Sequence, residues 1–87
     1  MDSYKIEFSR SAEKDLRRLD RQIIPRILAA IENLSENPRP HGSVKLGGSD
    51  SSYRIRVGDY RVIYTVFDTL LIVDIERVRH RKEVYQS

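Results

Sequence analysis

"YRIRVGDYRVIYTV", residues 53–66, is the stretch of this chain that decides its fold. Apolar side chains alternate with polar and charged ones on both sides of a Gly-Asp pair, which is typical of two antiparallel strands joined by a tight turn. A two-residue turn places six apolar or aromatic side chains on one sheet face, in the pairs Val57 with Tyr60, Ile55 with Val62 and Tyr53 with Tyr64. We expect this face to receive the helices.

Arginines gather on the opposite face of the same hairpin. Arg56 falls directly across from Arg61, and Arg54 lies one step along the strand. Direct cross-strand neighbours of like charge repel each other. Guanidinium groups also bind phosphate oxygens in a bidentate manner and stay charged at any useful pH. The hairpin alone therefore fits two interpretations, a merely solubilising face and a site for an anion.

The remaining sequence predicts a short strand, two helices and one further strand around the hairpin. Residues 4–8 alternate as a half-buried strand, and a helix capped by Ser9 or Ser11 follows. A second helix begins near residues 21–24, with Asp20 as a plausible cap and Pro25 in its first turn. Residues 39–52 predict a loop, in which "VKL" is at most mildly extended. A tight turn at Asp68-Thr69 leads into a last strand, "LLIVDI", and a basic tail.

These elements predict the α+β class. The expected architecture is a small, mostly antiparallel sheet packed by an N-terminal helical hairpin, in the order β-α-α-β-β-β, within one domain of residues 1–87. Continuing the register across the Asp68-Thr69 turn places Glu76 opposite Arg61. A β-bulge around Glu76 and Arg77 is needed to keep both Ile75 and Val78 in the core. With that bulge, the pattern leaves open which arginines of the last strand and tail join Arg61, among Arg77, Arg79 and Arg81.

Composition restricts the possible chemistry. The chain has 87 residues, a net charge of +3 and no cysteine, so disulfides and thiolate chemistry are excluded. No histidine pair has the spacing of metal ligands, and we predict neither a metal nor a cofactor. No apolar run reaches the roughly 18 residues of a membrane-spanning helix, and "MDSYKIEF" lacks the features of a signal peptide. We therefore expect a cytoplasmic protein without a membrane partner.

The tail, "RVRHRKEVYQS", adds aromatic and titratable groups to the arginines. Tyr85 is suited either to stack on an unpaired base or to anchor the tail against the sheet. His80 is suited to proton transfer near neutral pH, or is simply a surface histidine. Arginine beside an aromatic residue and a histidine favours a phosphodiester as the ligand.

The hairpin and "RVRHRKEVY", which follow a short strand and two helices ending in "ENPRP", together resemble the RelE/ParE superfamily of toxins from type II toxin–antitoxin systems. The resemblance extends from Tyr4 to Tyr85 and is strongest to the RelE-like branch. That branch implies a metal-independent endoribonuclease that cleaves mRNA, typically in the ribosomal A site, by attack of the 2′-hydroxyl on the adjacent phosphate. It also implies an acidic, RelB-like antitoxin as partner.

The resemblance also implies roles for individual residues. It carries over to Arg54, Arg56, Arg61, Arg81 and Tyr85. With His80 added from its own chemistry and Arg79 and Lys82 from their places in the basic strand end and tail, we predict catalysis by Arg56, Arg61, His80, Arg81 and Tyr85, and RNA binding by Arg54, Arg79 and Lys82. The best-known RelE-like pattern has lysines on the first hairpin strand, one of them a proposed general base, where this chain has Arg54 and Arg56. Arginine is effectively never neutral, so Arg56 fits stabilisation of the transition state rather than proton removal. This leaves His80, Tyr85, a water molecule and a group of the ribosomal RNA as candidate bases. We take His80 as the hypothesis, because histidine is the side chain that ordinarily exchanges protons near neutral pH.

Two further functions remain open at this point. A ParE-like toxin that inhibits DNA gyrase without nuclease activity shares the fold and much of the hairpin, although "HRKEVY" fits the nuclease branch better. A plain RNA-binding module is the third possibility. The antitoxin has two candidate docking surfaces between which the sequence does not choose, the arginine face and the basic side of the first helix, made of Lys14, Arg17, Arg18 and Arg21.

Overall fold

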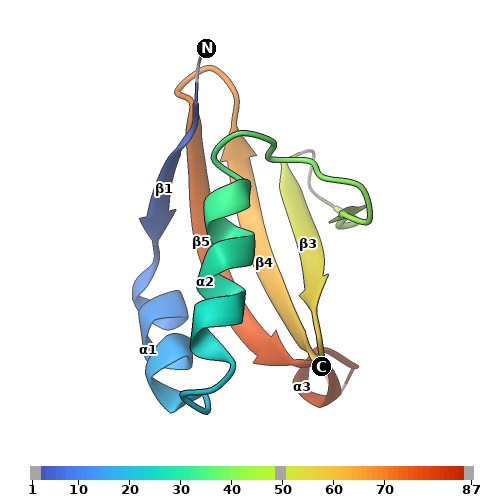
Figure 1. The fold of residues 1–87 in the computed structure, drawn as a ribbon. Coiled ribbons are helices and arrows are strands. Elements are labelled where there is room, and N and C mark those ends of the chain that lie inside the picture. Colours follow the sequence, from blue (N-terminus) through green and yellow to red (C-terminus); the bar gives the residue numbers. More distant parts are fainter. Residues whose placement is uncertain (1–2, 49–50, 86–87) are drawn as a thin grey trace.

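A five-stranded sheet in the order β1-β5-β4-β3-β2 forms the frame of the molecule (Figure 1). The computed structural model describes residues 3–48 and 51–85, with side chains described as far as residue 83. The strands are β1 (Lys5–Phe8), β2 (Val44–Lys45), β3 (Ser52–Val57), β4 (Tyr60–Phe67) and β5 (Ile72–His80). The helices are α1 (Arg10–Arg18), α2 (Ile24–Asn33) and α3 (Arg81–Tyr85). Within the described residues, no helix is long and apolar enough to cross a membrane.

The predicted α+β architecture is confirmed, with two short elements that the predicted order omitted. Only β1 pairs in parallel, with β5, and the other neighbouring strands are antiparallel. The loop after α2 contributes β2, which pairs with β3 at the sheet edge. The basic tail contributes α3. These two elements are too short to leave a clear periodic pattern in the sequence.

The starts of both long helices follow from local chemistry. Ser9 is the N-cap of α1, because its Oγ accepts a hydrogen bond from the backbone N of Ala12 at 3.0 Å. Pro25 lies in the first turn of α2, where its missing N–H is not needed. Asp20 does not cap α2. Its Oδ1 instead accepts from the backbone N of Gln22 at 3.2 Å, in the turn before the helix.

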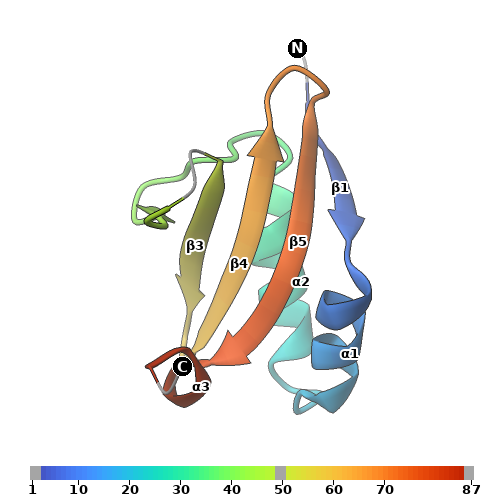
Figure 2. The same ribbon diagram turned by 180° about the vertical axis from the view of Figure 1, so that it is seen from behind.

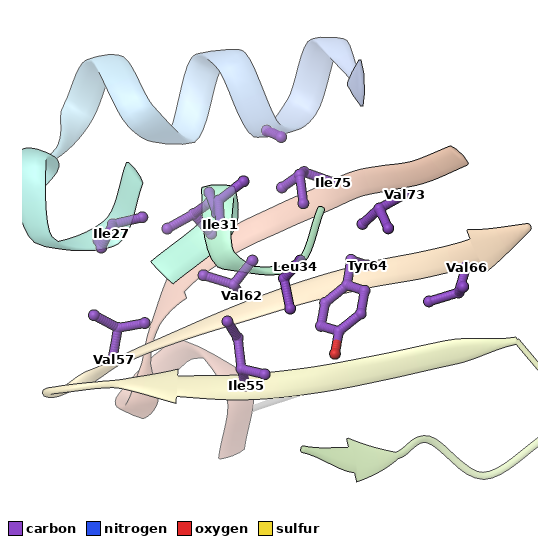
Figure 3. Packing of buried hydrophobic residues seen from close by; sticks show 12 residues of the cluster. Ile27, Ile31, Leu34, Ile55, Val57, Val62, Tyr64, Val66, Val73 and Ile75 are labelled. Atoms are coloured by element: carbon purple, nitrogen blue, oxygen red, sulfur yellow. The ribbon is translucent and has the colours of Figure 1, made fainter. Parts of the chain in front are cut away.

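The core lies between the helices and one face of the sheet. Figure 1 shows α2 crossing this face, and Figure 3 shows Ile27, Ile31 and Leu34 directed at side chains of the sheet. The predicted hairpin register is confirmed in all three pairs, Val57 with Tyr60, Ile55 with Val62 and Tyr53 with Tyr64. Removal of this apolar surface from water is the main contribution to the stability of the fold.

The connection between β4 and β5 is longer than predicted. Phe67 pairs with Ile72, so residues 68–71 form the connection and the expected tight turn at Asp68-Thr69 is wrong. Leu71 has a φ of 55°, a left-handed conformation that usually favours glycine. Because no glycine marks this turn, the sequence pattern suggested a strand that already began at Leu70.

The bulge in β5 is confirmed, and it changes which residue faces Arg61. Tyr64 pairs with Ile75 while Ile63 pairs with Arg77, so Glu76 is the extra residue of β5. Together with the longer turn, this shift places Arg79 opposite Arg61. The expected pairing of Glu76 with Arg61 is therefore wrong.

Tyr64 ties the core to the loop after α2. Its ring is fully buried, and its hydroxyl donates a hydrogen bond to the backbone oxygen of Pro38 at 2.7 Å. The adjacent Arg39 donates to both carboxylate oxygens of Asp68, at 3.1 and 2.7 Å. The loop is thus attached both to the core and to the β4–β5 turn.

We expect the buried hydroxyl of Tyr64 to make the fold sensitive to alkali. Burial raises the pKa of Tyr64 to about 12, whereas an unfolded tyrosine has a pKa near 10. The folded state favours the neutral phenol, so this contribution is complete below about pH 10 and is lost as the pH rises through about 12. Urea unfolding at about pH 9 and about pH 11.5 should show a smaller fall in stability for Tyr64→Phe than for the wild type. An equal fall in both proteins would contradict this assignment.

Candidate anion-binding site on the open sheet face

Three arginines stand side by side across three strands, on the sheet face that α2 leaves open. Arg61 of β4 pairs in register with Arg56 of β3 on one side and with Arg79 of β5 on the other. Figure 2 views the sheet from this face, with α2 behind it. We call Arg56, Arg61 and Arg79 the arginine row. No carboxylate among the described residues forms an ion pair with any of the three.

Backbone carbonyl groups hold two members of the arginine row in place. The oxygen of Gly58 accepts from Arg56 Nε at 3.1 Å and from Arg61 Nη1 at 3.4 Å. The oxygen of Tyr60 accepts from Arg61 Nη1 at 3.1 Å. Arg61 is only 8% exposed, although it lies outside the apolar core. Neutral carbonyls orient the guanidinium groups without cancelling their charge, which prepares the row for an anion.

The hairpin turn brings a further arginine close from the helix side. Gly58 has a φ of 60°, and a Cβ built on it would lie 3.4 Å from Nη1 of Arg26 in α2. The backbone conformation of the turn therefore favours glycine, and a side chain larger than alanine would also press on Arg26. Positive charge thus surrounds the turn on both sides of the sheet.

Gly58→Ala should lower the free energy of unfolding by about 1–2 kcal/mol, because an L-residue is strained in the left-handed conformation. Urea denaturation monitored by circular dichroism measures this loss. The matched control is Gly47→Ala, since Gly47 has no positive φ and open space around its Cβ position. Equal stabilities for the two variants would contradict the described turn.

The helix α3 places Arg81 at the turn end of the arginine row. It contacts β4 and β5 and lies on the open face in Figure 2. The backbone N of Arg81 donates to the oxygen of Asp59 at 2.7 Å, and its Nε lies 3.9 Å from Asp59 Oδ1. Lys82, the next residue, is exposed. The backbone of Tyr85 belongs to α3, but its side chain lies outside the described part of the chain, so its role stays a prediction.

His80 is not on the face of the arginine row. It pairs in register with Tyr60, whose partner Val57 belongs to the core, so its ring lies on the helix side of the sheet. The rings of His80 and Tyr60 meet edge to face, with centroids 5.3 Å apart. His80 Nδ1 accepts a hydrogen bond from the backbone N of Lys82 at 3.2 Å. Nearness in sequence had suggested that His80 joins the arginines, but strand alternation separates them.

Arg77 does not join the arginine row either. Its Nε and Nη2 donate to the two carboxylate oxygens of Asp15 in α1, at 2.9 and 3.1 Å. Asp15 Oδ2 also accepts from the backbone N of Val78 at 2.9 Å. The pairing of β5 with β1 ends at Ile75, opposite Phe8, and beyond that point the Asp15 carboxylate accepts the hydrogen bond from the edge of β5. Of the three candidate arginines, Arg79 lies beside Arg61, and Arg81 lies at the turn end of the row.

The open face changes charge along its length. Arg54 extends the positive region along β3, where it pairs with Ile63. Farther along, neighbouring strands bring together the acids Glu7, Asp74 and Glu76. Burial, together with Glu76 and Glu7, raises the pKa of Asp74. An extended anion is therefore attracted to the end of the sheet that holds the arginine row and is repelled by the other end.

Known proteins match this chain over nearly its full length. Residues 6–85 match the family described as ParE toxin of type II toxin–antitoxin system, parDE. Toxin RelG of Mycobacterium tuberculosis is 33% identical, with 95% of this chain and 97% of that protein covered. Toxin RelE3 of Methanocaldococcus jannaschii is 36% identical, with 93% and 94% covered.

Experimentally determined structures show the same fold. The archaeal RelE–RelB complex from Pyrococcus horikoshii OT3 matches with a TM-score of 0.79 at 30% identity, covering 90% of this chain and 94% of that one. The isolated Escherichia coli RelE toxin matches with a TM-score of 0.79 at 29% identity, covering 94% and 90%. The chain therefore belongs to the ParE toxin family of type II toxin–antitoxin systems, and the relatives that it resembles along its whole length are RelE toxins.

Proposed function

We propose that this toxin is an endoribonuclease that cleaves mRNA on the ribosome. The arginine row is the observation that carries the proposal, because three arginines are register neighbours on adjacent strands and none of them forms an ion pair with a carboxylate among the described residues. Such a row matches the charge of a phosphodiester backbone. The RNA substrate supplies its own nucleophile, the 2′-hydroxyl, so the chain does not need a nucleophilic side chain.

The proposed reaction is a transfer within the RNA. The 2′-oxygen attacks the adjacent phosphorus, the bond from phosphorus to the 5′-oxygen breaks, and a 2′,3′-cyclic phosphate and a 5′-hydroxyl result. The 2′-hydroxyl loses a proton to a base, and the departing 5′-oxygen gains one. Negative charge increases on the phosphoryl oxygens in the transition state, and fixed cations favour that state over the substrate.

The positions of the cations suggest separate roles. Arg61 lies at the centre of the row and is held by Gly58 and Tyr60, so we assign it to the phosphate that reacts. Arg56 and Arg79 flank it, and Arg81 lies beyond the turn. We assign Arg54 and Lys82 to phosphates on either side. Arginine stays protonated throughout, so none of these arginines is the base. We do not assign the base to His80, because its Nδ1 already accepts a hydrogen bond on the helix side.

We also propose an acidic antitoxin as partner. The similar structure from Pyrococcus horikoshii OT3 is a RelE–RelB complex, and this chain has two basic surfaces that suit an acidic partner. One is the arginine row, and the other is the exposed side of α1 with Lys14, Arg17 and Arg18. An antitoxin that covers the arginine row would block RNA binding directly.

The function is tested by inducing the toxin in cells and mapping a known message by primer extension. Discrete cuts at fixed positions within codons support the proposal. A second candidate function is the inhibition of DNA gyrase by a ParE-like toxin without nuclease activity. The description of the matching family supports this candidate, because it names ParE toxins. Intact messages together with loss of DNA supercoiling would support that candidate and reject the nuclease.

A further inference from the structure

The junction between β5 and α3 contains a histidine in a specific structural position. His80 is the last residue of β5 and directly precedes Arg81, the first residue of α3. Its Nδ1 accepts from the backbone N of Lys82, the second residue of the helix. This is the bond that an N-cap side chain makes, and it satisfies one of the backbone N–H groups that a helix start leaves without a partner.

We propose that His80 is a positioning residue, whose neutral imidazole caps α3 and thereby holds Arg81 beside the arginine row. The expected effect on cleavage rests on the proposed nuclease function, whereas the cap rests only on the hydrogen bond between His80 and Lys82. Protonation of the imidazole releases the cap, so α3 loosens in acid. His80 then affects the reaction through Arg81 and contacts neither the RNA nor the reacting atoms.

The protonation state of the ring decides whether the cap forms. Nδ1 accepts a hydrogen bond only when the imidazole is neutral and carries its proton on Nε2. The imidazolium has donors at both nitrogens, so it cannot accept from the amide of Lys82. Histidine is the side chain that ordinarily changes charge between pH 5 and 8. A positive charge at the start of a helix is also unfavourable next to its unsatisfied N–H groups.

The surroundings of His80 add further positive charge. A cavity of about 270 Å³ adjoins the ring, and its charged or titratable lining is Asp15 and Arg18 from α1, Tyr60 from β4, Arg77 and Arg79 from β5, and Glu83 from α3. Asp15 is already bound to Arg77 and to the β5 backbone. Glu83 is the remaining carboxylate of this lining. Proton uptake by His80 therefore adds a cation to a lining that already holds three arginines.

The cap acts on the site because it holds the start of α3, where Arg81 lies. Arg81 is bound through its backbone N to Asp59, and the neighbouring residue Gly58 is the one that orients Arg56 and Arg61. Loss of an N-cap lowers the equilibrium constant for forming the helix start by about fivefold. A helix of five residues has few internal hydrogen bonds to compensate for that loss.

Two variants of the full chain separate a cap from a base. Asparagine is a strong N-cap at every pH and has no titrating proton, whereas alanine offers no acceptor. Hydrogen exchange of the Lys82 amide, followed by NMR, reads the cap directly without any RNA. The quantity compared is the protection factor, which is the intrinsic exchange rate of the amide at each pH divided by the observed rate. In the wild type we expect this factor to be about fivefold lower at about pH 5.5 than at pH 8. His80→Asn should keep the protection at both pH values, and His80→Ala should lack it at both.

Cleavage of an mRNA substrate should follow the same pattern. His80→Asn should retain at about pH 5.5 the cleavage that the wild type loses, by about fivefold, and His80→Ala should be low throughout. The matched control is His41→Asn, because His41 is exposed in the loop after α2 and the chain has two histidines. The control should behave as the wild type in both measurements.

The outcomes distinguish the inference from the function on which it rests. Protection of Lys82 that does not change with pH in the wild type would overturn the inference. So would loss of cleavage in His80→Asn with Lys82 still protected, because that result makes His80 a general base. If protection follows the expected pattern but no protein cuts RNA at any pH, the cap is supported and the nuclease proposal fails.

Discussion

Arg61→Ala is expected to lower mRNA cleavage on the order of 10²–10³-fold and to remove the toxicity of the chain in growing cells. Arg61 is the central member of the arginine row, is almost fully enclosed and is oriented by two backbone carbonyls. A cation fixed at that position stabilises the phosphoryl charge without reorganising during the reaction. Primer extension after induction measures the cleavage, and colony counts measure the toxicity.

The matched control for this prediction is Arg10→Ala. Arg10 is exposed at the start of α1, away from the arginine row, so its removal takes away the same charge without touching the site. Arg10→Ala should cut as the wild type does. Urea denaturation should show that Arg61→Ala is folded, because Arg61 lies on the open face rather than in the apolar core. Wild-type cleavage by folded Arg61→Ala would contradict the assigned site.

Asp15→Ala is expected to lower the free energy of unfolding by about 2–3 kcal/mol. The Asp15 side chain is 11% exposed, and its carboxylate accepts two hydrogen bonds from Arg77 and one from the backbone of Val78. Its loss leaves a guanidinium and a strand-edge N–H without a protein partner. Urea denaturation at neutral pH measures the difference from the wild type.

Glu13→Ala is the control for Asp15→Ala, because it removes an acid from the same helix. Glu13 lies 4.0 Å from Arg17, and both side chains are more than half exposed. Exposed pairs of this kind contribute little, so the change should stay within about 0.5 kcal/mol. Equal losses for the two variants would show that Asp15 is not the link between α1 and β5.

The hairpin could be predicted from sequence to the level of individual pairs. Gly58 and Asp59 mark a tight turn, and the alternation on both sides, broken only by Ile63 within residues 53–66, leaves one register that buries the apolar set. The pairing of Arg56 with Arg61 followed from that register and is confirmed. Local chemistry also predicted the helix starts at Ser9 or Ser11 and near Pro25, since caps and prolines act over a few residues, and the structure has Ser9 as the first cap.

The third member of the arginine row could not be predicted in the same way. Its position depends on the longer turn that ends at Leu71 and on the bulge at Glu76, and the errors from these two features add along β5. A leucine in a left-handed conformation carries no sequence signal. The pattern therefore left Arg79 as one of three candidate arginines, and its place opposite Arg61 needed the structure.

Long-range contacts explain the other differences between prediction and structure. Arg77 is drawn away from the arginines by Asp15, which lies far from it in the sequence. His80 is close to the arginines in sequence but lies on the helix side of the sheet, where it caps α3. Neither arrangement follows from composition or spacing, because both depend on how α1 and α3 pack against the end of β5.

The most direct test of the central claim is the chemistry of the RNA ends that the toxin produces. Messages from cells that express the wild type are mapped by ligation methods specific for 2′,3′-cyclic phosphate and 5′-hydroxyl ends. They are compared with messages from cells that express Arg61→Ala. The arginine-row mechanism predicts such ends at discrete positions with the wild type and their absence with the variant. Intact messages in cells that the wild type nonetheless kills would contradict it.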